Sequence, residues 1–242
     1  MKEFVKGRYR VRLAASAGDI QAAQALRHRA FFGREGLDRD RFDARCDHVL
    51  VERDGGHLAG CFRLLLLPGG AQLCESYSAQ FYDLSGLARF EGGMLEMGRF
   101  CTDPALSDPD VLRVAWAALT GYVEDQNVKL LFGCASFAGV NAAPYRDSFA
   151  ILKARHIAPE RWRPKARAGL VYDFKDKNLA PADPKRGLAQ MPPLLRSYLA
   201  MGGWVSDHAV IDQQMGTLHV FTGLEVGAIP AARIRLLRAL AA

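Results

Sequence analysis

The amino-acid sequence predicts a mixed α/β domain arranged around one sheet. Two strands are expected at residues 49–53 and 58–67, because the Asp-Gly-Gly sequence at 54–56 between them is a strong hairpin signal. The apolar residues 128–136 predict a further strand that is central and buried. An amphipathic pattern over 111–126 predicts a helix directly before that strand. Helices alternating with strands in this way are typical of a sheet covered by helices.

The remaining elements continue this pattern. Asp19 is expected to cap the first helix, and Asp103-Pro104 is expected to end a strand. The predicted elements not yet named are, in chain order, a helix at 20–36, a loop with a short helix at 79–90, a strand at 94–102, a helix at 141–156 and a strand at 169–174.

The composition of the chain changes after Lys175. A linker-like stretch is expected there, followed by a strand at 218–224. The prolines that suggest the linker are Pro181, Pro184, Pro192 and Pro193. We interpret residues 1–175 as the core, and residues 176–242 as a C-terminal extension packed on the same domain.

Composition limits the class of protein. The chain has 242 residues, half of them hydrophobic, and a net charge of +6, which fits a folded, water-soluble protein and argues against a disordered chain. No apolar run approaches the roughly 20 residues of a membrane span, and the first residues lack a secretory signal. A cytoplasmic protein is therefore expected. The five cysteines are scattered without metal-ligand spacing, so free thiols and no metal site are expected.

Charge is distributed unevenly along the chain. Basic residues dominate 153–167 and recur at 233–238, whereas acidic residues cluster at 38–54. Nucleic-acid binding is not favoured, because the aromatic residues do not interleave with the basic ones. An acidic protein partner or an anionic membrane surface accounts for the same basic patches.

The motif EMGRFCTDP combines a carboxylate and a guanidinium in a strand expected to be buried. On a regular strand Glu96 and Arg99 would point to opposite faces. Gly98 between them favours a β-bulge, which would re-aim a side chain and turn backbone N–H groups outward. The alternative is an edge strand that carries an ordinary exposed pair of charges.

Two earlier motifs also place polar groups together. FDARCDH brings Asp43, Asp47 and His48 directly before the first hairpin strand, where carboxylates could hold an amino group or orient a catalytic partner. LRHRAFF places Arg27 and Phe31 one helical turn apart, which suits an anionic, partly apolar ligand. The alternatives are a polar loop for the first motif and an ordinary amphipathic surface for the second.

Taken in order, these motifs resemble the GNAT N-acyltransferases, in the branch that contains the acyl-homoserine-lactone synthases. The resemblance is closest to the L-ornithine N-alpha-acyltransferase family, whose members form aminolipids. It extends from about Arg8 to Thr222. The motifs that carry it are LRHRAFF, FDARCDH, FRLLLL, YSAQFYDLSGL, EMGRFCTDP, LLFGCASF and MPPLLRSYLAMGGWVSDHAVID.

The resemblance implies a GNAT-like fold with a mixed, splayed central sheet. It also implies transfer of a 3-hydroxyacyl chain from the 4′-phosphopantetheine of acyl carrier protein to the α-amino group of an amino acid, ornithine or glutamine, giving a lyso-aminolipid. No tightly bound cofactor is expected. The enzyme would work in the cytoplasm, in peripheral contact with the inner face of the bacterial cytoplasmic membrane.

The same resemblance assigns roles to individual residues. Glu96 would accept the proton of the attacking ammonium through water, with Arg99 beside it. Backbone N–H groups at Gly98 and Phe100 would stabilise the negative oxygen of the transition state. The polar network would comprise Arg27, Asp43, Asp47, Arg63 and Arg99, and the acyl or pantetheine pocket would be shaped by Phe31 and Phe81.

The donor-binding turn departs from that of the acetyl-CoA-dependent relatives. Their glycine-rich loop wraps a diphosphate at a helix N-terminus, but the corresponding residues 102–113 contain no glycine and three aspartates. This favours a donor carried on a protein over a coenzyme A thioester. The basic residues expected to dock the acidic carrier protein are Arg155, Arg161, Arg163 and Lys165, with Lys153 and Arg167 in the same stretch.

Two other functions are compatible with the sequence. One is an acyl-homoserine-lactone synthase, against which the long segment after Lys175 argues. The other is a non-catalytic basic module that binds an acidic protein or anionic lipid. The C-terminal segment with Arg233, Arg235 and Arg238 among apolar residues suggests contact with an anionic membrane, to which the lipid product of an aminolipid-forming acyltransferase would go.

Overall fold

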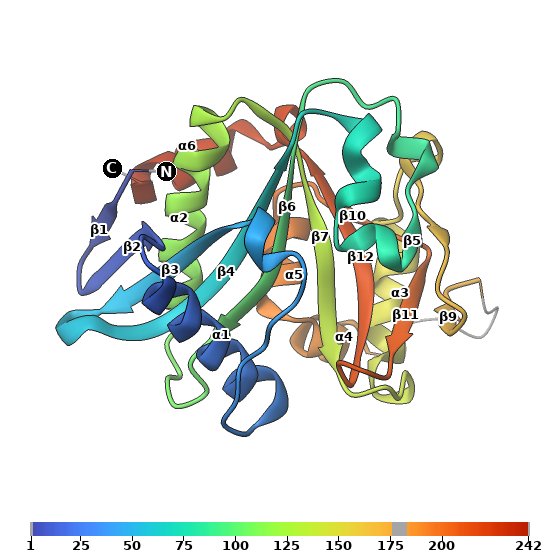
Figure 1. Cartoon of the computed structure of the whole chain (residues 1–242). Coiled ribbons are helices and arrows are strands. Elements are labelled where there is room, and N and C mark those ends of the chain that lie inside the picture. Colours follow the sequence, from blue (N-terminus) through green and yellow to red (C-terminus); the bar gives the residue numbers. More distant parts are fainter. Residues whose placement is uncertain (1, 176–182, 242) are drawn as a thin grey trace. The chain divides into compact units, whose positions relative to one another are not determined.

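The computed structural model describes residues 2–175 and 183–241, arranged as two compact units (Figure 1). Pro181 of the predicted linker lies outside these residues. The first unit comprises Met1–Leu66, Leu95–Val128 and Ala231–Ala242, and the second comprises Leu67–Met94 and Lys129–Pro230. Among the described residues, each unit contains strands of a ten-stranded sheet with helices packed against them, which confirms the predicted α/β class.

The first unit is built on an antiparallel meander. Its strands, in their order across the sheet, are β1 (Phe4–Lys6), β2 (Tyr9–Leu13), β3 (Asp47–Arg53), β4 (His57–Leu67) and β6 (Gly93–Thr102). The predicted hairpin is confirmed, with Val49 opposite Phe62 and the turn made by Gly55 and Gly56 at φ 81° and 80°. Glycine suits this turn because other residues rarely adopt positive φ.

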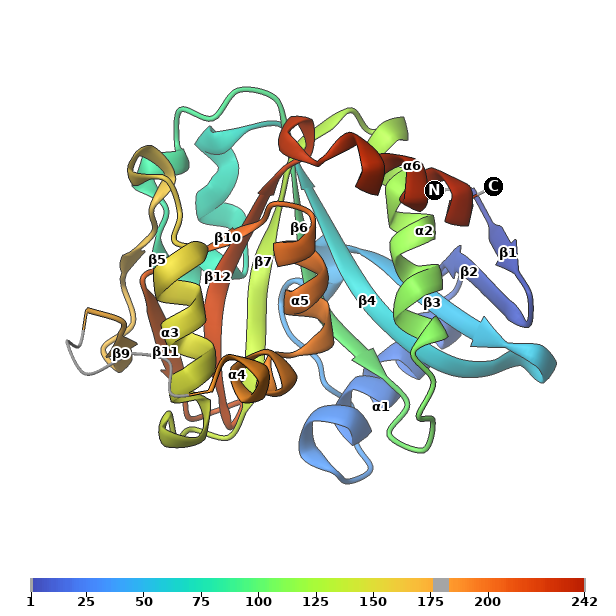
Figure 2. The same cartoon turned by 180° about the vertical axis from the view of Figure 1, so that it is seen from behind.

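Helices α1 (Ala17–Phe32) and α2 (Asp110–Asp125) pack on opposite faces of this meander. Leu50 packs with Ala23 of α1, whereas its strand neighbour Asp47, three positions away, contacts Tyr122 of α2. Odd and even positions of a strand point to opposite faces. One face therefore meets α1 and the other meets α2. Helix α6 (Ala231–Ala241) packs on α2 (Figure 2).

The start of α1 corrects the sequence prediction. The side chain of Ser16, not Asp19, caps the helix, because Ser16 Oγ accepts the N–H of Asp19 at 3.1 Å. Asp19 lies in the first turn and binds Arg12 and the N–H of Ala15. The helix ends at Gly33, which has φ 66°, so it is shorter than the predicted range 20–36.

The second unit is also built on antiparallel pairs. Its strands, in order, are β7 (Val128–Ala138), β12 (Thr217–Glu225), β11 (His208–Asp212) and β9 (Val171–Asp173), with β10 (Trp204–Val205) also paired to β12. Strands β5 (Tyr82–Asp83) and β8 (Lys165–Ala166) form a small pair of their own. The predicted strand at 218–224 is confirmed as β12, which runs antiparallel to β7.

The helices of the second unit are α3 (Arg146–Arg155), α4 (Pro184–Gln190) and α5 (Pro193–Ala200). The prediction of a linker is wrong for this part of the chain. Pro184 and Pro193 open two helices, because proline lacks only an N–H that the first helical position leaves unbonded. Helix α4 is tied to α3, since Arg186 Nε donates to Asp147 at 2.7 Å.

Short 3-10 turns connect these elements, at Asp43–Arg45, Asp54–Gly56, Gly70–Glu75, Ser78–Gln80, Ser85–Leu87, Ala143–Tyr145, Glu160–Trp162 and Val226–Ala228. Of the described helices, none has the combined length and apolar character that crossing a bilayer requires. The predicted boundary between residues 175 and 176 stays a prediction. Residues 183–230 of the C-terminal part pair and pack within the second unit, and 231–241 within the first.

Candidate active site

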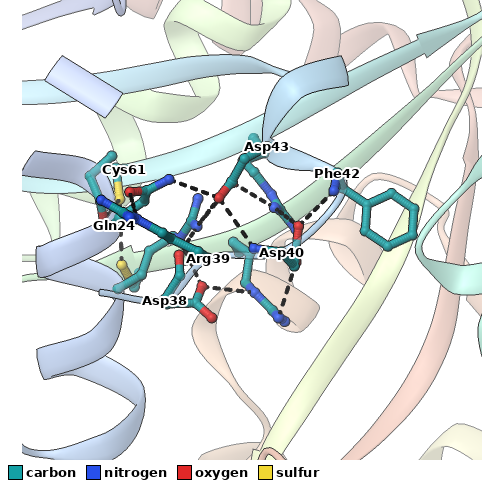
Figure 3. A network of polar contacts seen from close by, with 12 residues as sticks. Gln24, Asp38, Arg39, Asp40, Phe42, Asp43 and Cys61 are labelled. Atoms are coloured by element: carbon teal, nitrogen blue, oxygen red, sulfur yellow. Dashed lines mark hydrogen bonds and ion pairs between the residues drawn. The ribbon is translucent and has the colours of Figure 1, made fainter. Parts of the chain in front are cut away.

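A network of buried charges joins four segments of the first unit (Figure 3). Helix α1 supplies Arg27, the irregular segment 38–43 supplies three aspartates, β4 supplies Arg63 and β6 supplies Arg99. Three arginines therefore meet three carboxylates in one place, and the charges of the network balance.

Arg27 lies at the centre of this network and is 0% exposed. Its Nε donates to Asp38 Oδ2 at 2.8 Å, and its Nη2 donates to Asp43 Oδ1 at 3.0 Å. Nη2 also donates to the main-chain oxygen of Asp38. A guanidinium taken out of water needs such partners, because an unpaired buried charge costs several kilocalories.

Arg63 forms the second half of the network. Its Nη1 and Nη2 donate to the two carboxylate oxygens of Asp40 at 2.5 and 2.9 Å. Nη1 also donates to Asp43 Oδ1 at 2.7 Å. Burial by itself would lower the pKa of Arg63, but the two aspartates outweigh it and raise that pKa. The guanidinium is therefore charged at physiological pH.

The two partners of Arg63 respond in the opposite sense. Burial by itself would raise the pKa of Asp40 and of Asp43, but the arginines beside them hold both pKa values below their ordinary range. Asp43 also accepts a hydrogen bond from Gln24 at 2.9 Å. Its oxygens thus serve three side chains of the protein, so Asp43 orients the network and does not present a vacant carboxylate.

Arg99 closes the network from β6. Its Nε donates to Asp38 at 3.1 Å, and its guanidinium carbon lies 5.9 Å from the centre of the Phe31 ring. Arg99 has φ 55°, a left-handed conformation that costs a non-glycine residue about 1–3 kcal/mol. The irregularity expected at Gly98 therefore falls on Arg99. Its ion pairs with Asp38 and Asp40 hold it there.

Glu96 lies three residues before Arg99 on the same strand and is 4% exposed. Burial is the main cause that raises the pKa of the Cys46 thiol to about 11. The Glu96 carboxylate also raises this pKa, whereas Arg63 lowers it. Cys46 is therefore a neutral thiol at physiological pH and a poor nucleophile.

Asp47 does not join the network, contrary to the prediction. It lies on the α2 face of β3, exposed, where it accepts a hydrogen bond from Tyr122 Oη at 2.8 Å. The neighbouring His48 points to the other face, and its Nε2 lies 3.0 Å from the main-chain oxygen of Asp43. Asp43 lies in the 3-10 turn before β3, whereas Asp47 lies on the strand itself, where alternation directs it to the face opposite His48.

Asp38, Asp40 and Gln24 belong to the site although the sequence analysis did not name them. The one signal was the density of acidic residues from position 38 onward. That density could not show which carboxylates would pair with arginines, because the pairing depends on how an irregular segment folds over α1.

Phe81 lies in the second unit, where its ring packs edge-on to His219 at 4.8 Å and beside Tyr77 at 5.3 Å. Burial lowers the pKa of His219 to about 4, so this histidine is neutral at physiological pH. The shared pocket of Phe31 and Phe81 stays a prediction. The backbone groups of Gly98 and Phe100 likewise keep their predicted role untested.

The basic stretch of the second unit divides into two kinds of residue. Arg155 and Lys165 are exposed. Arg163 donates to the main-chain oxygen of Ala158 at 3.4 Å, and Arg161 lies 3.8 Å from Glu225 and over the Trp162 ring. Of these four described residues, Arg155 and Lys165 are the ones that are exposed and make no such contact. Over the described ranges, no cluster of three metal-ligating side chains occurs.

Comparison with known proteins first identifies the fold class of the chain. Residues 23–117 match the family model described as an acetyltransferase (GNAT) domain. The solved structure of FeeM, an N-acyl amino acid synthase from uncultured soil microbes, is 12% identical, covers 97% of both chains and has a TM-score of 0.52. The chain therefore has a GNAT-like fold.

Sequence relatives define the family within that class. The L-ornithine N(alpha)-acyltransferase of Rhodobacter capsulatus is 32% identical over 91% of each chain, and that of Brucella abortus is 32% identical over 94% of this chain and 88% of its own. The protein belongs to this family. An acyl-homoserine-lactone synthase of Agrobacterium fabrum is 28% identical over 51% of this chain and 61% of its own, which confirms the relation to that branch.

Replacing Arg27 is expected to destabilise the first unit strongly. An Arg27→Met variant removes one arginine partner from Asp38 and one from Asp43, and leaves the buried network with an uncompensated negative charge, which costs about 3–5 kcal/mol. An Arg27→Lys variant should recover only part of this, because an ammonium cannot bind both aspartates in the same way. Urea unfolding measures the free energies.

The matched control for Arg27 is Arg113→Met, which breaks the exposed pair of Arg113 with Asp110. That pair should contribute less than about 1 kcal/mol. Equal losses for Arg27→Met and Arg113→Met would show that the buried network does not stabilise the fold.

Acid is expected to weaken the folded state through Asp40 and Asp43. Their carboxyls have lower pKa values in the folded chain than in the unfolded one. The unfolded state therefore binds more protons near pH 4, and the free energy of unfolding falls as the pH drops through about 4. An Asp40→Asn variant should show a shallower fall over the same range. A fall as steep as that of the wild type would contradict this role.

Proposed function

We propose that the protein transfers a 3-hydroxyacyl chain from acyl carrier protein to the α-amino group of ornithine or a closely related amino acid such as glutamine. The product is an N-acyl amino acid, a lyso-aminolipid. The observation that carries this proposal is the buried Glu96 on the strand whose Arg99 anchors the ion network, in a chain that aligns along 91% of its length with an L-ornithine N(alpha)-acyltransferase.

The reaction needs a base, a polarised thioester and two aligned substrates. Glu96 accepts a proton from the ammonium through water, which gives the free amine. The amine nitrogen attacks the thioester carbon and a C–N bond forms. The C–S bond then breaks to release the pantetheine thiolate, which takes up the second proton lost by the nitrogen, while the first proton passes from Glu96 to water. Backbone N–H groups at Gly98 and Phe100 stabilise the oxyanion, and holding both substrates together supplies proximity.

The ion network supports this chemistry by fixing β6. Arg99 binds Asp38 and Asp40, which in turn bind Arg27 and Arg63. Each carboxylate of the network is engaged by an arginine, which suits these residues to positioning β6. The role of base is assigned to Glu96 because it lies buried on that strand, in the motif that resembles the family.

The start of α2 supports a donor carried on a protein. Asp108 Oδ1 accepts the N–H of Asp110 at 2.9 Å, and the other oxygen of Asp108 takes up Arg8 and the Tyr9 hydroxyl at 2.5 Å. An aspartate of the chain thus occupies the helix start at which a diphosphate would bind in coenzyme A-dependent relatives. A phosphopantetheine arm brings only one phosphodiester and does not need this position.

Helix α6 supports peripheral contact with the cytoplasmic membrane. Ile234 and Leu237 are half-buried on the α2 side, whereas Arg233, Arg235 and Leu236 are exposed. The apolar side of α6 is therefore covered by the protein itself. Contact with a bilayer would come from the arginines and the exposed leucine, by charge more than by insertion.

The proposed function is tested with purified protein, 3-hydroxyacyl carrier protein and either ornithine or glutamine, with the product identified by mass spectrometry. The Glu96→Gln variant should have a kcat for acyl transfer that is lower by a factor of about 10²–10⁴. The exposed Glu91→Gln serves as control and should keep wild-type kcat. No acylated amino acid from either acceptor would overturn the function, and an unchanged kcat in Glu96→Gln would remove the proposed base. The free acyl-CoA should be a poor donor in the same assay.

Docking of the carrier protein is expected to use Arg155 and Lys165. Because acyl carrier protein is acidic, Arg155→Glu with Lys165→Glu should raise KM for the carrier-bound donor several-fold and leave kcat unchanged. The effect should shrink at high salt. Lys2→Glu, an exposed change in the first unit, is the control and should leave KM unaltered. A donor KM that ignores both the substitutions and salt would refute this docking surface.

A further inference from the structure

A pocket of the first unit has no role in the chemistry described so far. It lies between the β1–β2 hairpin, α2 and the C-terminal end of α6, and its volume is about 360 Å³. Figures 1 and 2 both show α6 beside α2 and strand β1. Three cations, Lys6, Arg8 and Arg113, border the pocket, and Tyr9, Val114 and Leu240 form part of its apolar wall.

The cations around this pocket exceed the anions. Asp110 pairs with Arg113 at 2.7 Å, and Asp108 is engaged by Arg8. Over the described ranges, Lys6 has no ion-pair partner, and the same holds for Arg233 and Arg235 of α6. Helix α6 contains no acidic residue that could offset them. A monoanion entering the pocket therefore meets Lys6, which has no ion-pair partner among the described residues, and Arg113, whose side chain stays 60% exposed beside Asp110.

The elements that frame the pocket also expose aliphatic side chains. Val5 of β1 is 63% exposed and Leu236 of α6 is 51% exposed. A free phosphate in water would gain nothing from these side chains. A lipid headgroup brings an anionic phosphate together with a membrane surface that would cover both of them.

We propose that this pocket binds the phosphate and glycerol of an anionic glycerophospholipid at the surface of a bilayer. The volume exceeds that of one phosphate and lies at the lower end of the range of about 300–1,000 Å³ for small-molecule sites. The apolar wall would face the glycerol, and Lys6 and Arg113 would face the phosphate. This inference deepens the membrane contact proposed above and rests on it, but not on the chemistry of acyl transfer.

The test is co-sedimentation of the full chain with vesicles of phosphatidylethanolamine, with and without phosphatidylglycerol. Wild-type protein should bind only the anionic vesicles. A Lys6→Gln, Arg113→Gln double variant should bind them more weakly by about fivefold for each cation removed. The matched control, Arg155→Gln with Lys165→Gln, removes the same charge from exposed positions of the second unit and should bind like the wild type.

Several outcomes would overturn the proposal. The first is equal vesicle binding by the wild type and the pocket variant. The second is an equal loss of binding in both double variants, which indicates diffuse electrostatics. The third is thermal stabilisation by inorganic phosphate without any vesicle binding, which indicates a free phosphate ligand. Acyl transfer from soluble carrier-bound donor is assayed in parallel and should stay unchanged in the pocket variant. Loss of vesicle binding with intact transfer, or the reverse, thus separates failure of this proposal from failure of the proposed function.

Discussion

The burial of Arg27 is the constraint on which the first unit depends. A guanidinium with no exposed surface must have its charge balanced inside the protein. It obtains that balance from Asp38 and Asp43, residues of a segment with little regular structure. The irregular segment is therefore held against α1 by ion pairs. The same aspartates also bind Arg63 of β4 and Arg99 of β6. The positions of these two side chains therefore depend on Arg27 of α1.

Pairing with arginines also distinguishes the acidic residues from one another. Asp38, Asp40 and Asp43 are engaged by arginines and act as positioning residues. Asp47 belongs to the opposite face of β3, where it binds Tyr122. The left-handed backbone at Arg99 costs energy that its ion pairs offset, which is the usual condition for strain at a functional position. Acylation chemistry at β6 would thus depend on residues that are engaged with one another.

Charge outside the network is used for recognition in the functions proposed. The aspartate at the start of α2 occupies a position at which related enzymes can bind a diphosphate, and this favours a donor presented by a protein. Cations of the second unit suit an acidic carrier, whereas those around β1, α2 and α6 suit a lipid surface. The two groups belong to different units, so each can be altered without the other.

The sequence by itself determined the α/β class, the hairpin, the strands that carry Arg63 and Glu96, and the resemblance that the relatives confirm. These follow from local signals: turn residues, side-chain periodicity and motif order. Only the tertiary structure decided that Asp38 and Asp40 enter the network and Asp47 does not, that Ser16 caps α1, and that Pro184 and Pro193 begin helices. The reason is physical. Ion pairing, face selection and the choice between linker and helix depend on groups distant in the chain, whose proximity no local pattern encodes.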